Sequence, residues 1–107
     1  MDDAAQTEIT WQVPPAHPVF DGHFPGRPIV PGVWILDQVV DAVRQWQGWT
    51  QEPMKLDSAK FFQPVGPGAT LTFTLQKKAS GSVAFKARQG GAVVASGQLA
   101  QGSSDQP

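Results

Sequence analysis

The chain has 107 residues, of which eight are basic and nine acidic, and its formal net charge is −1. This length fits a single domain, and the hydrophobic fraction of 40% supplies a modest core. The absence of cysteine excludes disulfides, thiolate catalysis and cysteine-based zinc sites. The balanced charge gives no concentrated positive field for nucleic acid, and no apolar run approaches the roughly 20 residues of a membrane helix.

Both ends of the sequence are polar, so we expect residues 1–6 and 102–107 to be flexible termini around a single domain spanning 7–101. The acidic start, Met1 to Ala5, lacks the basic and apolar regions of a signal peptide, which predicts a cytoplasmic protein. A small domain without cross-links is marginally stable alone, and we therefore expect association with another subunit.

The first structured segment is a short strand in which Ile9, Trp11 and Val13 alternate with polar residues. Residues 14–32 then contain six prolines and three glycines, which exclude a helix and leave little room for a strand. Because aromatic and apolar side chains are interspersed among them, we predict a long ordered loop, and long loops of this kind are typically functional.

Helical periodicity follows from Val33 to about Trp46, and Gly48 stands where the helix is expected to end. The polar residues Asp37, Asp41 and Arg44 are spaced to share one helical face. Two apolar stripes indicate a helix wrapped by other structure: Val33, Leu36, Val40 and Val43 form one, and Ile35, Val39, Ala42 and Trp46 form the other.

Four strand-like segments complete the chain, and glycine and proline clusters separate most of them. They span Lys55–Phe62, Thr70–Gln76, Ser82–Arg88 and Ala92–Ala100. One buried helix after a first strand, followed by antiparallel strands, predicts an α+β fold in which a curved antiparallel β-sheet wraps around a central α-helix.

The loop and the helix start together carry a candidate chemistry. His23 lies in a proline-stiffened turn, where its imidazole could act as a base. No Ser, Thr, Asp or Asn immediately precedes the helix, so the amides of Gly32 and Val33 are free to receive an oxygen that gains negative charge. Asp37 lies in an apolar part of the helix, where a carboxylate is costly unless it is paired or used. A base, an oxyanion donor and a carboxyl group are the parts that β-elimination from a 3-hydroxyacyl thioester needs.

Two stretches of the sequence resemble motifs of a known family. The run from Phe20 to Val33, FDGHFPGRPIVPGV, is similar to the signature of the β-hydroxyacyl-(acyl carrier protein) dehydratases of fatty acid synthesis, and AKFFQPVGPG from Ala59 to Gly68 resembles their second motif. The resemblance covers roughly residues 8–100 and implies a hot-dog fold and a homodimer, or a higher oligomer, whose active sites are shared between subunits.

The resemblance also implies roles for particular residues. His23 falls on the family's catalytic histidine, and Asp37, fourteen residues later, falls on its catalytic carboxylate. The first helical turn near Gly32 falls where the family binds the thioester oxygen. The candidate substrate-binding residues are Gly32, Val33, Phe24 and Trp34, although core packing is an alternative role for Trp34. The implied substrate is a thioester of acyl carrier protein or coenzyme A, and no metal or other cofactor is implied.

The sequence departs from the family pattern at three places. Only sixteen residues precede His17, so we expect the family's N-terminal helix and leading strand to be missing. Asp41 replaces a glutamine, and Ala69 replaces an acidic residue. Short members with this outline resemble the dehydratases of aryl-polyene and related polyketide-like clusters. His17 is expected to be structural, and Asp41 to pair with Arg44.

Two other functions remain open. A hot-dog thioesterase would use Asp37 or Asp41 to activate water, although it would have no need for a base at His23. A non-catalytic subunit would bind an acyl chain or a carrier without turnover. Carrier recognition requires basic residues near the pocket mouth, for which Arg27, Lys60 and Arg88 are candidates.

Overall fold

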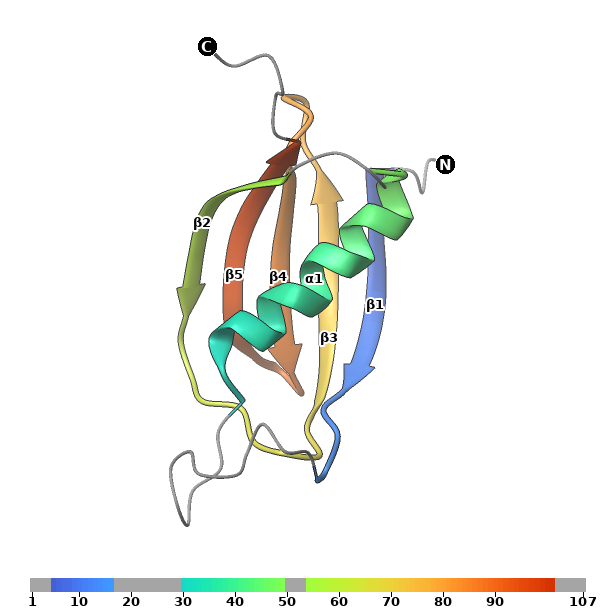
Figure 1. Cartoon of the computed structure of the whole chain (residues 1–107). Helices are drawn as coiled ribbons and strands as arrows, with labels where there is room; N and C mark the ends of the chain where they lie inside the picture. The colour runs from blue at the N-terminus through green and yellow to red at the C-terminus, as the bar shows by residue number, and fades with distance from the viewer. Residues whose placement is uncertain (1–4, 17–29, 50–53, 102–107) are drawn as a thin grey trace.

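A computed structural model describes residues 5–16, 30–49 and 54–101 (Figure 1). Of the segments that lie outside these ranges, residues 17–29 contain His17, His23, Phe24 and Arg27. All the predicted elements within the described ranges are present. They are β1 (Gln6–Gln12), α1 (Gly32–Gln47), β2 (Met54–Phe61), β3 (Thr70–Lys77), β4 (Val83–Gln89) and β5 (Ala92–Gln101).

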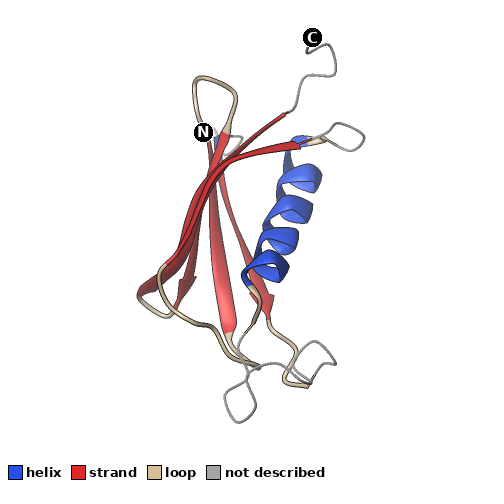
Figure 2. Ribbon diagram, turned by 60° about the vertical axis from the view of Figure 1, so that its left-hand side comes forward, coloured by secondary structure: helices blue, strands red, loops and turns tan. Residues whose placement is uncertain are grey.

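The strands form one antiparallel sheet in the order β1-β3-β4-β5-β2. Strands β1 and β2 are therefore the two edges, although only α1 separates them among the described elements of the sequence. Figure 1 shows α1 running diagonally across the sheet, and Figure 2 shows that it lies on one face. This arrangement confirms the predicted hot-dog fold, with a curved antiparallel sheet around a central helix.

Side-chain alternation decides which face of the sheet is buried. On β3 and β4, the inward residues are fully buried, and their register places Phe73 opposite Ala87 and Leu75 opposite Phe85. The threonines of β3 alternate with these residues and therefore lie on the opposite face. The apolar half of each strand thus meets the helix, while the polar half forms the outer surface.

The helix buries one of its two apolar stripes more fully than the other. Ile35, Val39 and Ala42 are buried against the sheet, as the prediction requires. In the other stripe Val43 is buried, but Val33 is 67% exposed. Leu36 and Val40 of this stripe are partly buried against the core, so within the described part of a single chain the second stripe is covered only in part.

The end of α1 agrees with the sequence prediction. Gly48 has a φ of 74° and a ψ of 21°, a left-handed conformation that glycine adopts without steric cost. The Arg44 carbonyl accepts a hydrogen bond from the Gly48 amide, and the Arg44 guanidinium donates to the Trp49 carbonyl at 2.8 Å. Asp41 accepts a 3.0 Å hydrogen bond from Gln45 one turn later. No helix in the described ranges is long and apolar enough to cross a membrane.

Candidate active site at the start of the helix

The described end of the first motif, Val30 to Val33, meets the second motif at the end of the molecule where α1 begins. The Val30 amide donates to the Val65 carbonyl at 2.7 Å, and both side chains are buried. At the end of β1, the Val13 amide donates to the Ala69 carbonyl at 2.8 Å, and the Val13 carbonyl accepts from the Gly68 amide at 3.1 Å. The chain on both sides of residues 17–29 is thus fixed to the segment 65–69.

The helix begins without a side-chain cap. Pro31 occupies the N-cap position, no capping hydrogen bond from its side chain is possible, and the first turn contains no acidic residue. The Pro31 carbonyl accepts hydrogen bonds from Trp34 at 3.0 Å and Ile35 at 3.4 Å. The amides of Gly32 and Val33 precede these bonds, so they belong to the first turn, whose amides have no intrahelical partner. Such amides can stabilise a developing oxyanion.

A cavity of about 410 Å³ lies beside this helix start. Its lining combines the end of the first motif with the second motif and is mostly apolar. The ring of Phe61 lies over Gly32, where an added Cβ would be 2.9 Å from the Phe61 Cζ. Glycine is therefore needed at position 32 unless the ring moves. The lining residues are Val30, Gly32, Ile35, Phe61, Phe62, Gln63, Pro64 and Val65.

The remaining predicted substrate-binding residues lie elsewhere or outside the described ranges. Val33 points into solvent, and neither it nor Trp34 lines the cavity. The Trp34 ring packs edge-to-face on Trp11, with centroids 5.3 Å apart, and Trp11 stacks on Phe73. Trp34 thus packs on Trp11 of β1, which in turn packs on Phe73 of β3. Phe24 belongs to residues 17–29.

Asp37 is exposed on the helical face opposite the buried Ile35. It does not line the cavity, and in a single chain the carboxylate carries no burial cost. The sequence suggested that burying the Asp37 carboxylate would be costly. That cost would arise only if another surface covered this face of α1. His23, the proposed base, lies outside the described residues, so its position relative to Asp37 remains a prediction.

Phe61 and Phe62 line the cavity, although they are not among the candidate residues predicted from the sequence. Phe61 contacts Gly32 although 29 positions separate them. Residue periodicity gives no sign of such a contact, because it depends on where the end of β2 meets the helix. The available signal was the second motif, which contains both residues.

Comparison with known proteins decides the family. The family model described as "ApeI-like: ApeI dehydratase" matches residues 1–98. The chain belongs to the ApeI-like dehydratase family. This agrees with the resemblance to the β-hydroxyacyl-(acyl carrier protein) dehydratases and with the narrower likeness to the aryl-polyene type.

Curated relatives of this chain are named 3-hydroxyacyl-[acyl-carrier-protein] dehydratase FabZ. The protein from Chlamydia trachomatis serovar L2 is 39% identical over 95 residues, which cover 77% of this chain and 62% of the relative. The protein from Ehrlichia chaffeensis is 41% identical over 63 residues, covering 54% of this chain and 44% of the relative. The matched region therefore spans less than two thirds of these relatives.

Solved structures support the fold. The dehydratase heterocomplex ApeI:P from Xenorhabdus doucetiae matches with a TM-score of 0.78 and 22% identity, covering 91% of this chain and 87% of that one. A fluoroacetyl-CoA thioesterase, FlK, also matches, with a TM-score of 0.66 and 16% identity over 88% of this chain and 81% of that one. Because a dehydratase complex and a thioesterase share the fold, the fold alone does not select the reaction.

Proposed function

We propose that this chain dehydrates 3-hydroxyacyl thioesters, carried by acyl carrier protein, to trans-2-enoyl thioesters. The observation that carries the proposal is the apolar cavity that ends at the uncapped amides of Gly32 and the first helical turn. An acyl chain suits the apolar lining, and the thioester oxygen suits the amides. The relatives' names, which specify an acyl-carrier-protein substrate, support the choice of carrier.

The proposed reaction is a β-elimination. His23 removes a proton from the carbon next to the thioester carbonyl, and the negative charge that develops on the oxygen is stabilised by the amides near Gly32. The C3–oxygen bond then breaks, and Asp37 donates a proton to the departing hydroxyl, which leaves as water. Transfer of the proton from His23 to solvent and reprotonation of Asp37 restore the starting state, so the reaction needs no metal or redox cofactor.

A second subunit would complete this site. Four large apolar side chains are exposed in the described residues, and all belong to the helix start, β2 or the residue after it: Val33, Leu56, Phe61 and Phe62. Among the described strands, β2 is also a sheet edge, and its outer backbone groups have no partner strand there. We propose a homodimer formed along β2, whose second subunit covers the Asp37 face of the helix and shares the active site. The ApeI:P heterocomplex makes a different hot-dog partner the alternative.

The dimer proposal predicts that Leu56→Lys shifts the protein toward monomers. A buried, unpaired charge at the interface is costly, and Leu56 is 46% exposed in the single chain, so the variant can still fold. Analytical ultracentrifugation at matched concentrations measures the shift. Thr10→Lys, on the opposite edge strand β1, is the control and should leave the oligomeric state unchanged. Equal effects of the two variants, or a monomeric parent protein, would contradict an interface along β2.

The reaction is tested with 3-hydroxyacyl and trans-2-enoyl thioesters of several lengths, on carrier protein and on coenzyme A. We expect reversible hydration and dehydration, measured by enoyl absorbance and mass spectrometry, without release of free thiol. Release of thiol without hydration would instead identify a thioesterase, the activity of the structurally similar FlK. Substrate binding without turnover would identify a non-catalytic subunit or a missing partner.

A further inference from the structure

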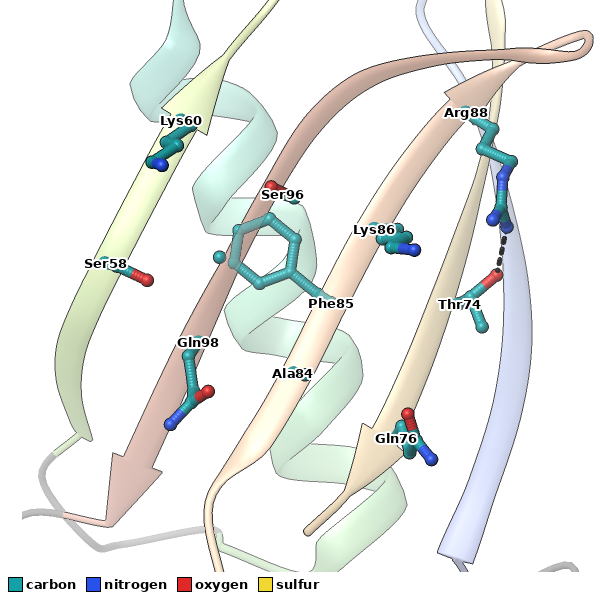
Figure 3. Close-up of a pocket in the computed structure, with 11 residues that line it drawn as sticks. Ser58, Lys60, Thr74, Gln76, Ala84, Phe85, Lys86, Arg88, Ser96 and Gln98 are labelled. Carbon is teal, nitrogen blue, oxygen red and sulfur yellow. Dashed lines mark hydrogen bonds between the residues drawn. The ribbon is translucent and has the colours of Figure 1, made fainter.

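The face of the sheet that points away from α1 contains a depression of about 390 Å³. It extends over β2, β5, β4 and β3, as Figure 3 shows. Three cationic side chains line it, together with hydroxyl groups: Lys60, Lys86, Arg88, Ser58, Thr74 and Ser96. Lys60 lies on the opposite side of β2 from its neighbour Phe61, so this depression is separate from the cavity at the helix start.

The strand register brings the cations together. Lys60 of β2 pairs with Ser96 of β5, Ser96 pairs with Lys86 of β4, and Lys86 pairs with Thr74 of β3. Because adjacent strands are about 4.8 Å apart, the two lysine backbones are roughly 10 Å apart with the Ser96 hydroxyl between them. Arg88 is two residues beyond Lys86 and therefore points to the same face. Lysine side chains are long enough to converge on one anion above Ser96.

The cations differ in how firmly they are held. The Arg88 guanidinium donates a 3.2 Å hydrogen bond to the Thr74 hydroxyl, which fixes one side of the depression. Lys60 and Lys86 are exposed and make no hydrogen bond or ion pair with the described residues. The two ammonium groups can therefore reorient toward a ligand without losing a partner from the described ranges.

The charge of the depression is unbalanced. Three of the chain's eight basic residues line it, and none of the acidic residues within the described ranges does, although the whole chain carries a net charge of −1. The carboxylate of Glu8 lies on the same face but on edge strand β1, one strand beyond Thr74. An anion bound between Lys60 and Lys86 would relieve the repulsion among the cations.

The same features limit the kind of ligand. A second copy of this chain stacked through the same face would bring like charges together. A broad protein interface normally has an apolar centre, whereas this surface is lined mainly by charged, hydroxyl and amide side chains. We propose that the depression binds the pyrophosphate group of a small phosphorylated ligand, with its oxygens between Lys60, Lys86 and Ser96.

The proposal is tested by titrating the full chain with inorganic pyrophosphate at low ionic strength, using calorimetry and amide chemical shifts. We expect saturable binding, with shifts centred on Ser96 and Lys86, that weakens as salt is added. Lys60→Gln and Lys86→Gln should each weaken binding about five- to tenfold, because each removes one charged contact. Lys78→Gln removes an exposed charge outside the depression and should change binding less than about twofold.

Three results would overturn the proposal. One is the absence of saturable binding at low ionic strength. Another is an equal loss of affinity in Lys78→Gln and Lys86→Gln, which would indicate attraction by overall charge. The third is a set of shifts confined to the first turn of α1, which would place the anion at Gly32. A poly-glutamate peptide serves as a competing probe, and tighter binding of this peptide than of pyrophosphate would identify an acidic protein surface as the partner instead.

Discussion

His23→Ala and Asp37→Asn are each expected to lower the rate of enoyl-thioester hydration by about two to four orders of magnitude, the usual contribution of a positioned general acid or base. In the proposed elimination, the first variant removes the base and the second removes the proton donor. Steady-state kinetics on carrier-bound substrates measures both losses. Because Asp37 is exposed in the single chain, asparagine at this position should leave the folded structure intact.

Asp41→Asn is the matched control for Asp37→Asn. Asp41 lies one helical turn further along, is also exposed, and loses the same charge on substitution. Its hydrogen bond with Gln45 can be kept by the asparagine oxygen. We expect the Asp41→Asn variant to hydrate enoyl thioesters at a rate within about twofold of the parent protein. An equal loss in both variants would indicate a general effect of helix charge, and full activity of Asp37→Asn would remove Asp37 from the mechanism.

Mixing the two inactive variants tests whether a site is shared between subunits. If one subunit supplies His23 and the other Asp37, half of the dimers formed at random contain one intact site of two. The mixture should then recover about a quarter of the parent activity after subunit exchange. If both residues act within one subunit, no dimer contains an intact site and the mixture stays inactive. This result separates the shared-site proposal from the proposed reaction itself.

The sequence predicted those parts of the fold that depend on local periodicity. The alternation around Phe73 and Phe85 identified strands, and the helical stripes together with Gly48 identified the helix and its end. The strand order was not predictable from these patterns, because nothing local places β1 and β2 at opposite edges. The order nevertheless decides which strand is available to a second subunit.

The candidate site was predictable only in part from the sequence. The uncapped helix start followed from the absence of a capping residue before Gly32, which is a local property. The surroundings of Asp37 did not follow, because a helical position is buried only if another element covers that face. The contact of Phe61 with Gly32 also depends on tertiary structure. The missing information was the position of β2 relative to the helix for Phe61, and for Asp37 it was whether another surface covers its face of the helix.

Gly97→Ala is expected to destabilise the fold by about 3 kcal/mol, at the upper end of the usual cost of overpacking. Gly97 of β5 pairs with Phe85 of β4 and with Ala59 of β2. An added Cβ would meet the Ser58 carbonyl oxygen and lie 2.6 Å and 2.7 Å from two atoms of the Phe85 ring. The ring is fully buried and cannot move aside without disturbing the core. Denaturant unfolding at a fixed protein concentration measures the loss.

Gly91→Ala is the control, because an added Cβ at this position meets no atom within 4 Å. This variant should change the free energy of unfolding by less than about 1 kcal/mol. If the two variants are equally stable, the absence of a Cβ at Gly97 is not what allows the Phe85 ring to occupy its described position. The double variant Gly97→Ala/Phe85→Leu separates the two obstacles. Leucine is smaller than phenylalanine, so the double variant should cost less than the sum of the single changes if the ring is the main obstacle. If the free-energy costs of the two single changes simply add, the main obstacle to the alanine Cβ is the backbone of β2 at Ser58. The position of this strand also determines how Phe61 covers Gly32.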